Sequence, residues 1–193
     1  MVGAQGAAPH AVARARSHRP HPEAARRAAL EDGVEELWAY RERLLGRHAE
    51  QVASFRSVLG AFPARRLTEP APDGGWSAHQ LAVHVRDVEI QAYIPRVHRL
   101  LAEANPLLAD FDAEAFMAEH YDPGEPVSRI AEDVDRARQA LRAELPFDRA
   151  QAWSRTGRHP ALGVRSVQTW VERAVAHFDE HLLQLEARLR AAQ

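Results

Sequence analysis

The stretch Ala176–Leu185, "AHFDEHLLQL", is the part of the sequence that indicates the fold most directly. It carries two histidines, His177 and His181, four residues apart near the C-terminus. Around them, apolar residues recur at the spacing of one face of a helix: Val167, Val171, Ala174, Phe178, Leu182, Leu185 and Leu189. At about 100° per residue His181 falls within this stripe and His177 at its edge, so both should point into a core, roughly 6 Å apart at Cβ.

Helical periodicity appears in four segments, at about residues 34–59, 77–104, 127–145 and 166–191. Helical signals begin earlier, at about Pro22, and we expect an interruption at Gly33. Ser77 is the expected N-cap of the second helix, and Pro95 should kink that helix or loosen one of its turns. These segments predict the main helices of the protein.

Two long connections separate the later helices, at about residues 105–126 and 146–165, and the first should hold a short helix around Ala113–Glu119. No segment shows the alternation of a strand. We therefore predict an all-α protein, a four-helix bundle with two long connections, over residues 23–193. Residues 1–22, rich in Ala, Arg, His and Pro, are expected to form a disordered tail.

The composition excludes several kinds of function. A chain of 193 residues fits one domain, and a net charge of −2 gives no basic surplus for nucleic acid. The absence of cysteine rules out disulfides, thiolate ligands and a cysteine nucleophile. The sequence contains no run of about 18 apolar residues, which a membrane span would need, and no signal peptide is apparent. We therefore expect a cytoplasmic protein.

The paired histidines have two interpretations. An unsatisfied buried polar group costs about 1–3 kcal/mol, and either a shared metal ion or hydrogen bonds within the core would satisfy both imidazoles. Because the chain has 11 histidines, such a pair arises easily by chance, so the spacing leaves both interpretations open. A metal site would need a third ligand, and His84 is the best candidate because it borders the apolar stripe of the second helix.

Five segments, in this order along the chain, carry a family resemblance: "GGWS" (74–77), "LAVHVRDVEIQAYIPRVHRLL" (81–101), "EANPLLADFDAEAF" (103–116), "WSRTGRHPALG" (153–163) and "AHFDEHLLQL" (176–185). From about residue 34 to 190 the chain resembles the DinB superfamily and, within it, the branch of bacillithiol-transferase-like metal-dependent hydrolases. The resemblance implies a four-helix bundle of unusual connectivity. It also implies one divalent metal ion, held by His84, His177 and His181.

A three-histidine site that stays open can lower the pKa of bound water for hydrolysis, or bind a substrate thiol as thiolate. The resemblance therefore implies a metal-dependent enzyme, either a transferase that moves a low-molecular-weight thiol to an electrophilic small molecule or a hydrolase. We expect Zn or Ni, with Fe or Mn as alternatives. The resemblance also implies a homodimer. The alternatives are a non-catalytic metal-binding or stress-response interaction protein, and a helical bundle without metal.

Two further residues near the expected ligands have candidate roles. Asp87 could orient an imidazole or accept a proton, and the alternative is a surface carboxylate paired with an arginine. Gln184 continues the row of His177 and His181 and could hydrogen-bond to a ligand. Glu89 points away from His84, and we expect it to form a structural ion pair.

The long connections should form the rim of a substrate pocket. The candidates are Tyr93, His120, Tyr121, Trp153, Arg155 and His159. Arg155 and Arg158 could bind a carboxylate or phosphate of a thiol cosubstrate. The alternative for each is an ordinary surface residue, which is also what we expect of His48. The tryptophans Trp38, Trp76 and Trp170 are expected in the core.

Overall fold

The computed structural model describes residues 22–72 and 74–192. Its elements are α1 (Pro22–Ala61), η1 (Ala64–Arg66), α2 (Ala78–Val88), η2 (Glu89–Tyr93), α3 (Ile94–Ala102), α4 (Ala113–His120), α5 (Val127–Glu144), α6 (Ala150–Ser154), β1 (Thr156–His159), β2 (Gly163–Ser166) and α7 (Val167–Ala192). The predicted tail over residues 1–22 lies outside the described residues, apart from Pro22, which begins α1.

The chain divides into two units between Glu36 and Leu37. In the first unit the described residues belong to α1, where Arg27 Nε donates to Glu31 Oε1, one turn further on, at 2.9 Å. The helix runs through Gly33 without a break, so the predicted interruption is wrong. A single glycine costs a helix about 1 kcal/mol relative to alanine, which the surrounding helix formers can offset.

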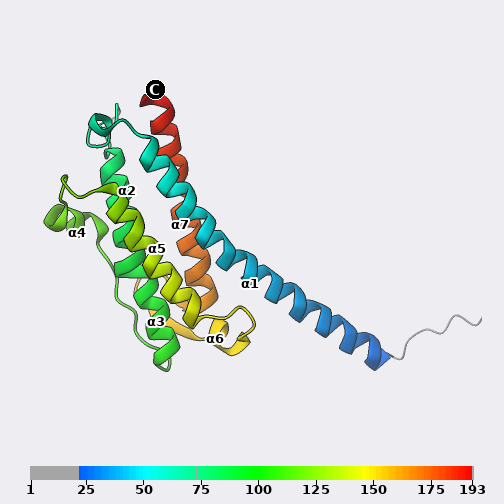
Figure 1. Cartoon of the computed structure of the whole chain (residues 1–193). Coiled ribbons are helices and arrows are strands. Elements are labelled where there is room, and N and C mark those ends of the chain that lie inside the picture. The colour runs from blue at the N-terminus through cyan, green and yellow to red at the C-terminus, as the bar shows by residue number, and fades with distance from the viewer. Residues whose placement is uncertain (1–21, 73, 193) are drawn as a thin grey trace, which may run out of the picture. The chain divides into compact units, whose positions relative to one another are not determined.

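Four helical segments of the second unit form a bundle: α1 from Leu37 onward, the run α2–η2–α3, α5 and α7 (Figure 1). Helix α2 contacts both α5 and α7. Helix α1 is tied to α7 by a buried hydrogen bond of 2.8 Å from Gln51 Nε2 to the Val175 carbonyl. The predicted four-helix bundle is therefore confirmed. No helix in the described ranges combines the length and the apolar character needed to cross a membrane.

The second predicted helix begins and bends where its sequence indicates. Ser77 Oγ accepts from the Gln80 backbone N–H at 3.1 Å, and Gln80 Oε1 accepts from the Ser77 N–H at 2.9 Å, so both form a capping box. The turn before Pro95 widens into the π-helical turn η2, and Pro95 lies in the first turn of α3. Proline has no N–H to donate to the preceding turn, and in a regular helix its ring would clash with a carbonyl of that turn. The wider π-helical turn removes this clash. The expected loosened turn is confirmed.

A buried ion pair joins the wide turn to the rest of the bundle. Glu89, the first residue of η2, is 1% exposed, and its Oε1 accepts from Arg138 Nε of α5 at 2.8 Å. Arg138 also donates to Gln51 Oε1 of α1 at 2.8 Å and lies 4.1 Å from the ring centroid of Phe178 on α7. Glu89 thus forms the structural ion pair that the sequence predicts. Its partner, Arg138, contacts each of the other helices of the bundle.

We expect Arg138→Met to lower the free energy of unfolding by about 3–5 kcal/mol, because it leaves the Glu89 carboxylate buried without its cation. The double variant Glu89→Leu/Arg138→Met should be more stable than Arg138→Met alone. Urea unfolding followed by circular dichroism measures both. The control is Arg56→Met, which breaks an exposed pair with Asp135 and should cost no more than about 1 kcal/mol. Equal losses in Arg138→Met and Arg56→Met would contradict the prediction.

The second long connection contains a β-hairpin, so the expectation of no strands is wrong. Strands β1 and β2 pair antiparallel, with Thr156 opposite Ser166 and His159 opposite Gly163. Four residues per strand are too few for alternation to be recognisable in the sequence. The segment before α4 joins the hairpin, because the Leu108 N–H donates to the Arg158 carbonyl at 2.7 Å. The two long connections therefore pack against one another.

Gly157 allows this packing. A Cβ atom at Gly157 would lie 2.7 Å from Leu100 Cδ2 and 2.8 Å from the Pro106 carbonyl oxygen, which is closer than real Cβ atoms approach. The carbonyl belongs to the backbone and cannot rotate away. The hairpin can therefore lie this close to α3 only with glycine at position 157.

We expect Gly157→Ala to lower the thermal unfolding midpoint by several degrees, because the added methyl group must push the hairpin from α3. Gly46→Ala is the matched control. No atom lies within 4 Å of its added Cβ, so alanine in the α1 interior should stabilise by about 0.5–1 kcal/mol. Differential scanning calorimetry measures both variants. The same shift in both would show that the contact at Gly157 is unimportant.

Candidate metal centre

Three histidines from two helices meet inside the bundle. His84 lies on α2, and His177 and His181 lie one turn apart on the facing side of α7. The Nε2 atom of His177 is 3.2 Å from Nε2 of His84 and 3.2 Å from Nε2 of His181. All three ligand nitrogens lie within 4.8 Å of one another, and all three rings are partly buried. The residues predicted as one metal-binding set are therefore together in space.

The protonation of the three rings suits a metal site. Burial lowers the pKa of His84 to about 4 and that of His177 to about 3, with the neighbouring His181 adding to both shifts. Both rings are therefore neutral at pH 7, as metal ligands must be. His181 Nδ1 lies 3.0 Å from Gln184 Oε1, so this nitrogen carries the proton and its Nε2 carries the lone pair. Gln184 thus has the contact that its predicted supporting role requires.

Hydrogen bonds among the rings satisfy the cluster poorly. The single Nε2 atom of His177 faces two other Nε2 atoms, and one imidazole nitrogen cannot donate to both. The buried Nδ1 of His84 has no hydrogen-bond partner. Nitrogens at about 2.0–2.1 Å from a tetrahedral metal lie roughly 3.3 Å apart, close to the spacing found. The donor set therefore fits one divalent cation.

A cavity of about 250 Å³ adjoins the cluster on the side of His177. Its wall includes His177, Tyr93, His159, Trp170, Arg96 and Arg173. The Tyr93 ring lies 5.6 Å from the His177 ring, centroid to centroid. On the other side of the cluster the half-buried Trp76 lies 4.8 Å from the ring of His84, so Trp76 covers a histidine besides packing on the core.

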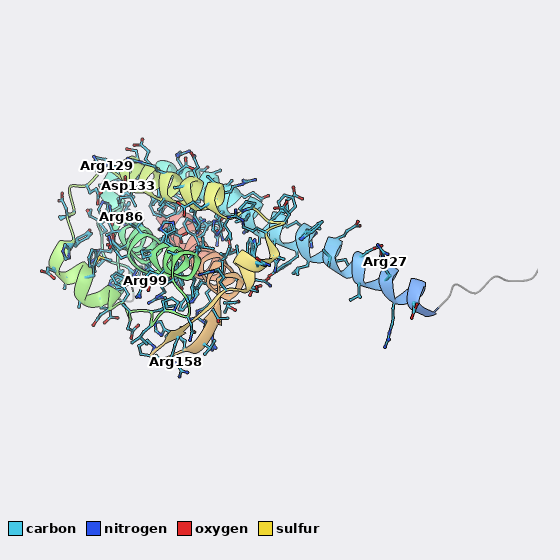
Figure 2. All side chains as sticks on the ribbon, turned by 90° about the horizontal axis from the view of Figure 1, so that it is seen from below. Arg27, Arg86, Arg99, Arg129, Asp133 and Arg158 are labelled. Carbon is cyan, nitrogen blue, oxygen red and sulfur yellow. The ribbon has the colours of Figure 1, made fainter. Side chains whose placement is uncertain are left out.

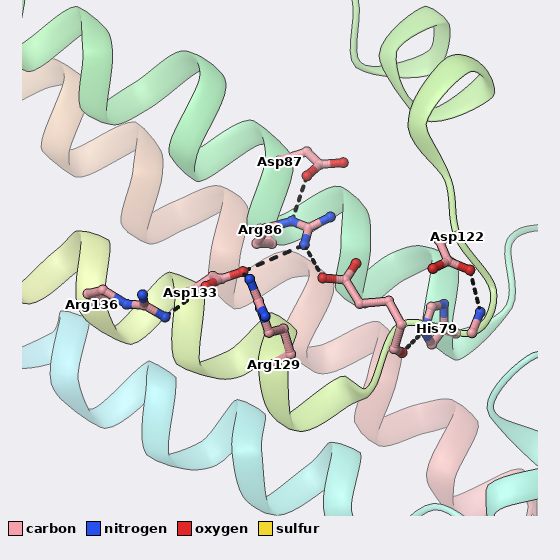
Figure 3. Close-up of polar contacts among 9 residues, drawn as sticks. His79, Arg86, Asp87, Asp122, Arg129, Asp133 and Arg136 are labelled. Atoms are coloured by element: carbon pink, nitrogen blue, oxygen red, sulfur yellow. Dashed lines mark hydrogen bonds and ion pairs between the residues drawn. The ribbon is translucent and has the colours of Figure 1, made fainter.

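Asp87 lies in a network of ion pairs beside the cluster (Figure 3). Its Oδ1 accepts from Arg86 Nε at 2.6 Å, and Arg86 Nη1 donates to Glu125 at 2.7 Å. Asp133 lies 3.9 Å from the same nitrogen. Burial raises the pKa of Asp87, and the charge of Arg86 opposes that shift. Asp87 thus has the arginine partner named in the alternative, but it is buried and not at the surface. The contacts of Arg86 with Glu125 and Asp133 connect α2 to the start of α5 and to α5 itself.

Two of the predicted rim residues lie near this network. Tyr121 Oη lies 3.1 Å from Nδ1 of the buried His79, whose Nε2 is 2.7 Å from the Glu125 carbonyl. His120 is exposed and stacks on Phe116, with 4.1 Å between ring centroids. Both residues hold the end of α4, and neither belongs to the wall of the cavity beside His177.

Trp153 and Arg155 lie away from the cavity. Trp153 is fully buried, and its Nε1 donates to the Pro146 carbonyl at 2.9 Å. Arg155 donates to the carbonyls of Leu100 and Glu103, which fixes the start of the hairpin on α3. Neither residue lines the cavity beside His177, because their polar groups dock the connection, and their assignment to a substrate rim stays a prediction.

Two further histidines are buried. His159, a rim candidate with a surface position as its alternative, is 3% exposed and lies in the cavity wall. His48 is 2% exposed on α1, and burial, together with the charges of Arg138 and Arg142, lowers its pKa to about 3. The positions of both follow from long-range packing that the sequence pattern does not contain.

The sequence interpretation missed three residues of the cavity: Arg96, Trp170 and Arg173. Arg173 precedes His177 by four residues, so it lies on the same face of α7, and this spacing could have indicated it. Arg96 lies in α3, three residues after Tyr93, which is the last residue of the π-helical turn. No sequence signal indicates that α3 and α7 bring these residues to one cavity.

Fold and site together define a helical bundle in which three histidines form a candidate site for a divalent metal ion. Residues 47–185 match the family model of the DinB superfamily, and the chain belongs to this family. The solved structure of YfiT from Bacillus subtilis, "a probable metal-dependent hydrolase with an unusual four-helix bundle topology", resembles the chain with a TM-score of 0.64 and 21% identity, over 78% of this chain and 86% of that one. No curated protein matches the chain significantly.

We expect the purified protein, loaded with zinc or nickel and freed of excess metal, to carry close to one ion per chain. His84→Ala and His177→Ala should each weaken binding by more than about 10-fold, because two imidazoles do not make a stable site. Gln184→Ala should weaken it by about 10-fold, because the tautomer of His181 is then no longer fixed. Elemental analysis and competition with a chromophoric chelator measure these changes.

The matched control is His98→Ala. His98 lies on α3, where its Nε2 pairs with Glu144 at 3.4 Å, so its loss should leave the metal content unchanged. Folding of each variant is checked by circular dichroism. Metal retained by both His84→Ala and His177→Ala would exclude the three-histidine site and restore the interpretation of a core cluster.

Proposed function

We propose that this protein is a metal-dependent enzyme that transfers a low-molecular-weight thiol to an electrophilic small molecule, or that hydrolyses a small molecule. The observation that carries the proposal is the convergence of three imidazole nitrogens beside a cavity whose wall includes His177. Three protein ligands leave coordination positions open. When bound there, a divalent ion such as Zn or Ni acts as a Lewis acid and lowers the pKa of a coordinated water or thiol.

The cavity wall supplies a proton donor. Burial raises the pKa of Tyr93, so its phenol stays protonated at neutral pH. Its hydroxyl can therefore donate a hydrogen bond to a substrate oxygen or to a leaving group. Trp170, Val88 and Ala92 give the same cavity an apolar side, which limits the water that reaches the reacting atoms. Tyr93 is the residue of this chain that we assign to proton donation.

The absence of cysteine fits a reaction in which the thiol enters with a cosubstrate. The alternative, a non-catalytic metal-binding protein, requires a closed site with a fourth protein ligand. In the described part of the chain, the histidine cluster contains three candidate ligands and adjoins a cavity, which favours an enzyme. The homodimer, the stress-response role and the cytoplasmic location stay predictions.

We expect metal-loaded protein to accelerate either conjugation of bacillithiol, mycothiol or glutathione to a bimane electrophile, or hydrolysis within a panel of small amides and esters. Tyr93→Phe should lower kcat by about 10–100-fold with little change in metal content, because it removes one positioned donor. Tyr121→Phe is the matched control, since that hydroxyl contacts His79 instead of the cavity.

Full activity in Tyr93→Phe would remove Tyr93 from the mechanism. Equal rates in the metal-loaded wild type and in folded His177→Ala, in both screens, would contradict the enzyme and leave the non-catalytic metal-binding protein. Retention of metal in the Tyr93 variant keeps loss of the donor separate from loss of the ion.

A further inference from the structure

The cavity beside His177 carries more positive than negative charge. Two arginines, Arg96 and Arg173, line it together with one carboxylate, Asp110. Asp110 is 71% exposed, and its Oδ1 lies 4.0 Å from Arg96 Nη2, at the limit of an ion pair. The same oxygen accepts from the Phe111 backbone N–H at 3.0 Å. Asp110 therefore leaves most of the cationic charge of the cavity uncompensated.

Arg96 is held in place without a carboxylate. Its side chain is 11% exposed, its guanidinium lies 4.6 Å from the ring centroid of Trp170, and its Nη2 donates to the Ala109 carbonyl at 3.1 Å. Burial lowers the pKa of Arg96, and the nearby Arg173 lowers it further. A fixed, largely buried guanidinium beside a second cation is unfavourable unless an anion joins them.

The exposed Arg173 has no carboxylate partner among the described residues. It lies one turn before His177 on α7, and within residues 22–72 and 74–192 it makes no hydrogen bond or ion pair. Many other arginines of the bundle are paired, as Arg86 is with Asp87 and Glu125 (Figure 3). A guanidinium presents a planar fork of donors that matches a carboxylate. Arg173 is therefore free to receive an anionic ligand at the cavity wall.

His159 contributes a third unused donor. Its Nδ1 accepts from the backbone N–H groups of Ala161 and Leu162, both at 3.3 Å, so the proton of the neutral ring is on Nε2. This Nε2 is buried without a hydrogen-bond partner, and the 3.5 Å to Asp110 Oδ1 is too long for a strong one. A residue that is 3% exposed thus keeps an unpaired N–H in the wall of the same cavity.

We infer that this cavity binds the carboxylate of a small organic anion, and that the substrate of the metal centre carries that carboxylate. Arg173 and Arg96 supply the charge, and His159 Nε2–H and the Tyr93 hydroxyl supply further donors. The two guanidinium groups and His159 Nε2–H can only donate, and the Tyr93 hydroxyl can donate as well, so an anion rich in acceptor atoms satisfies them. A volume of about 250 Å³ lies near the lower end of ligand pockets and selects a small molecule. The inference rests on the proposed function and narrows its substrate class.

The test is calorimetric titration of the zinc-loaded full chain with succinate, succinamide and inorganic phosphate. Succinate should bind, and Arg173→Gln should weaken it at least 10-fold while the zinc content stays the same. Succinamide, which has the same size without charge, should not bind measurably. Arg158→Gln is the matched control, because Arg158, a candidate anion contact from the sequence, is exposed on the hairpin (Figure 2) and does not line this cavity. The affinity of this variant for succinate should equal that of the wild type.

Equal succinate affinity in the wild type and Arg173→Gln would overturn the inference. Preferential binding of phosphate with the same dependence on Arg173 would overturn the inference of a carboxylate ligand and show that the site binds phosphate. The His84→Ala background separates this inference from the proposed function, since His84 does not line the cavity. If Arg173-dependent succinate binding persists there, the anion site stands even when the enzyme assays fail.

Discussion

The buried ion pair between Glu89 and Arg138 is the interaction on which the other features of the bundle depend. It desolvates two charges, so it is favourable only with the geometry that α1, η2, α5 and α7 supply together. Glu89 follows His84 by five residues, and Phe178, which packs against Arg138, follows His177 directly. The ion pair joins η2 to α5, and through Phe178 its arginine also packs on α7, beside the turn that carries His177. The polar core and the histidine cluster therefore use the same neighbouring helices.

Much of the fold could be predicted from local signals. The 3.6-residue period identified the helices of the bundle, the capping box at Ser77 marked where α2 begins, and Pro95 marked the widened turn. The inward direction of two of the clustered histidines could be predicted for a related reason. His177 and His181 share one helical face with a strong apolar stripe, so their direction follows from their own helix. The choice of His84 as the third ligand depended on the apolar stripe of a second helix. The assignment of all three histidines to one metal ion came from the family resemblance.

The features that the sequence did not predict depend on contacts between distant segments. The hairpin is too short for periodicity, and it is held by the close approach of Gly157 to α3. The cavity combines Arg96, Arg173 and His159 from three elements, so no spacing within one helix indicates it. Arg155 looked like a substrate contact because it lies in a long connection. It instead satisfies the carbonyls at the end of α3, which shows that a loop cation can be structural.

The site separates two electrostatic tasks along α7. The imidazole nitrogens of His177 and His181 suit a cation, whereas Arg173, one turn before His177 on the same face, suits an anion. The four residues from Arg173 to His177 advance about 6 Å along the helix. A metal ion at the histidines and an anion at Arg173 would therefore lie within the length of one small molecule. The lowered pKa of His177 follows from burial and from these positive neighbours, which keep its lone pair free. Arginine near the cluster therefore favours the protonation state that metal binding requires, and it also provides a counter-charge for an anionic substrate.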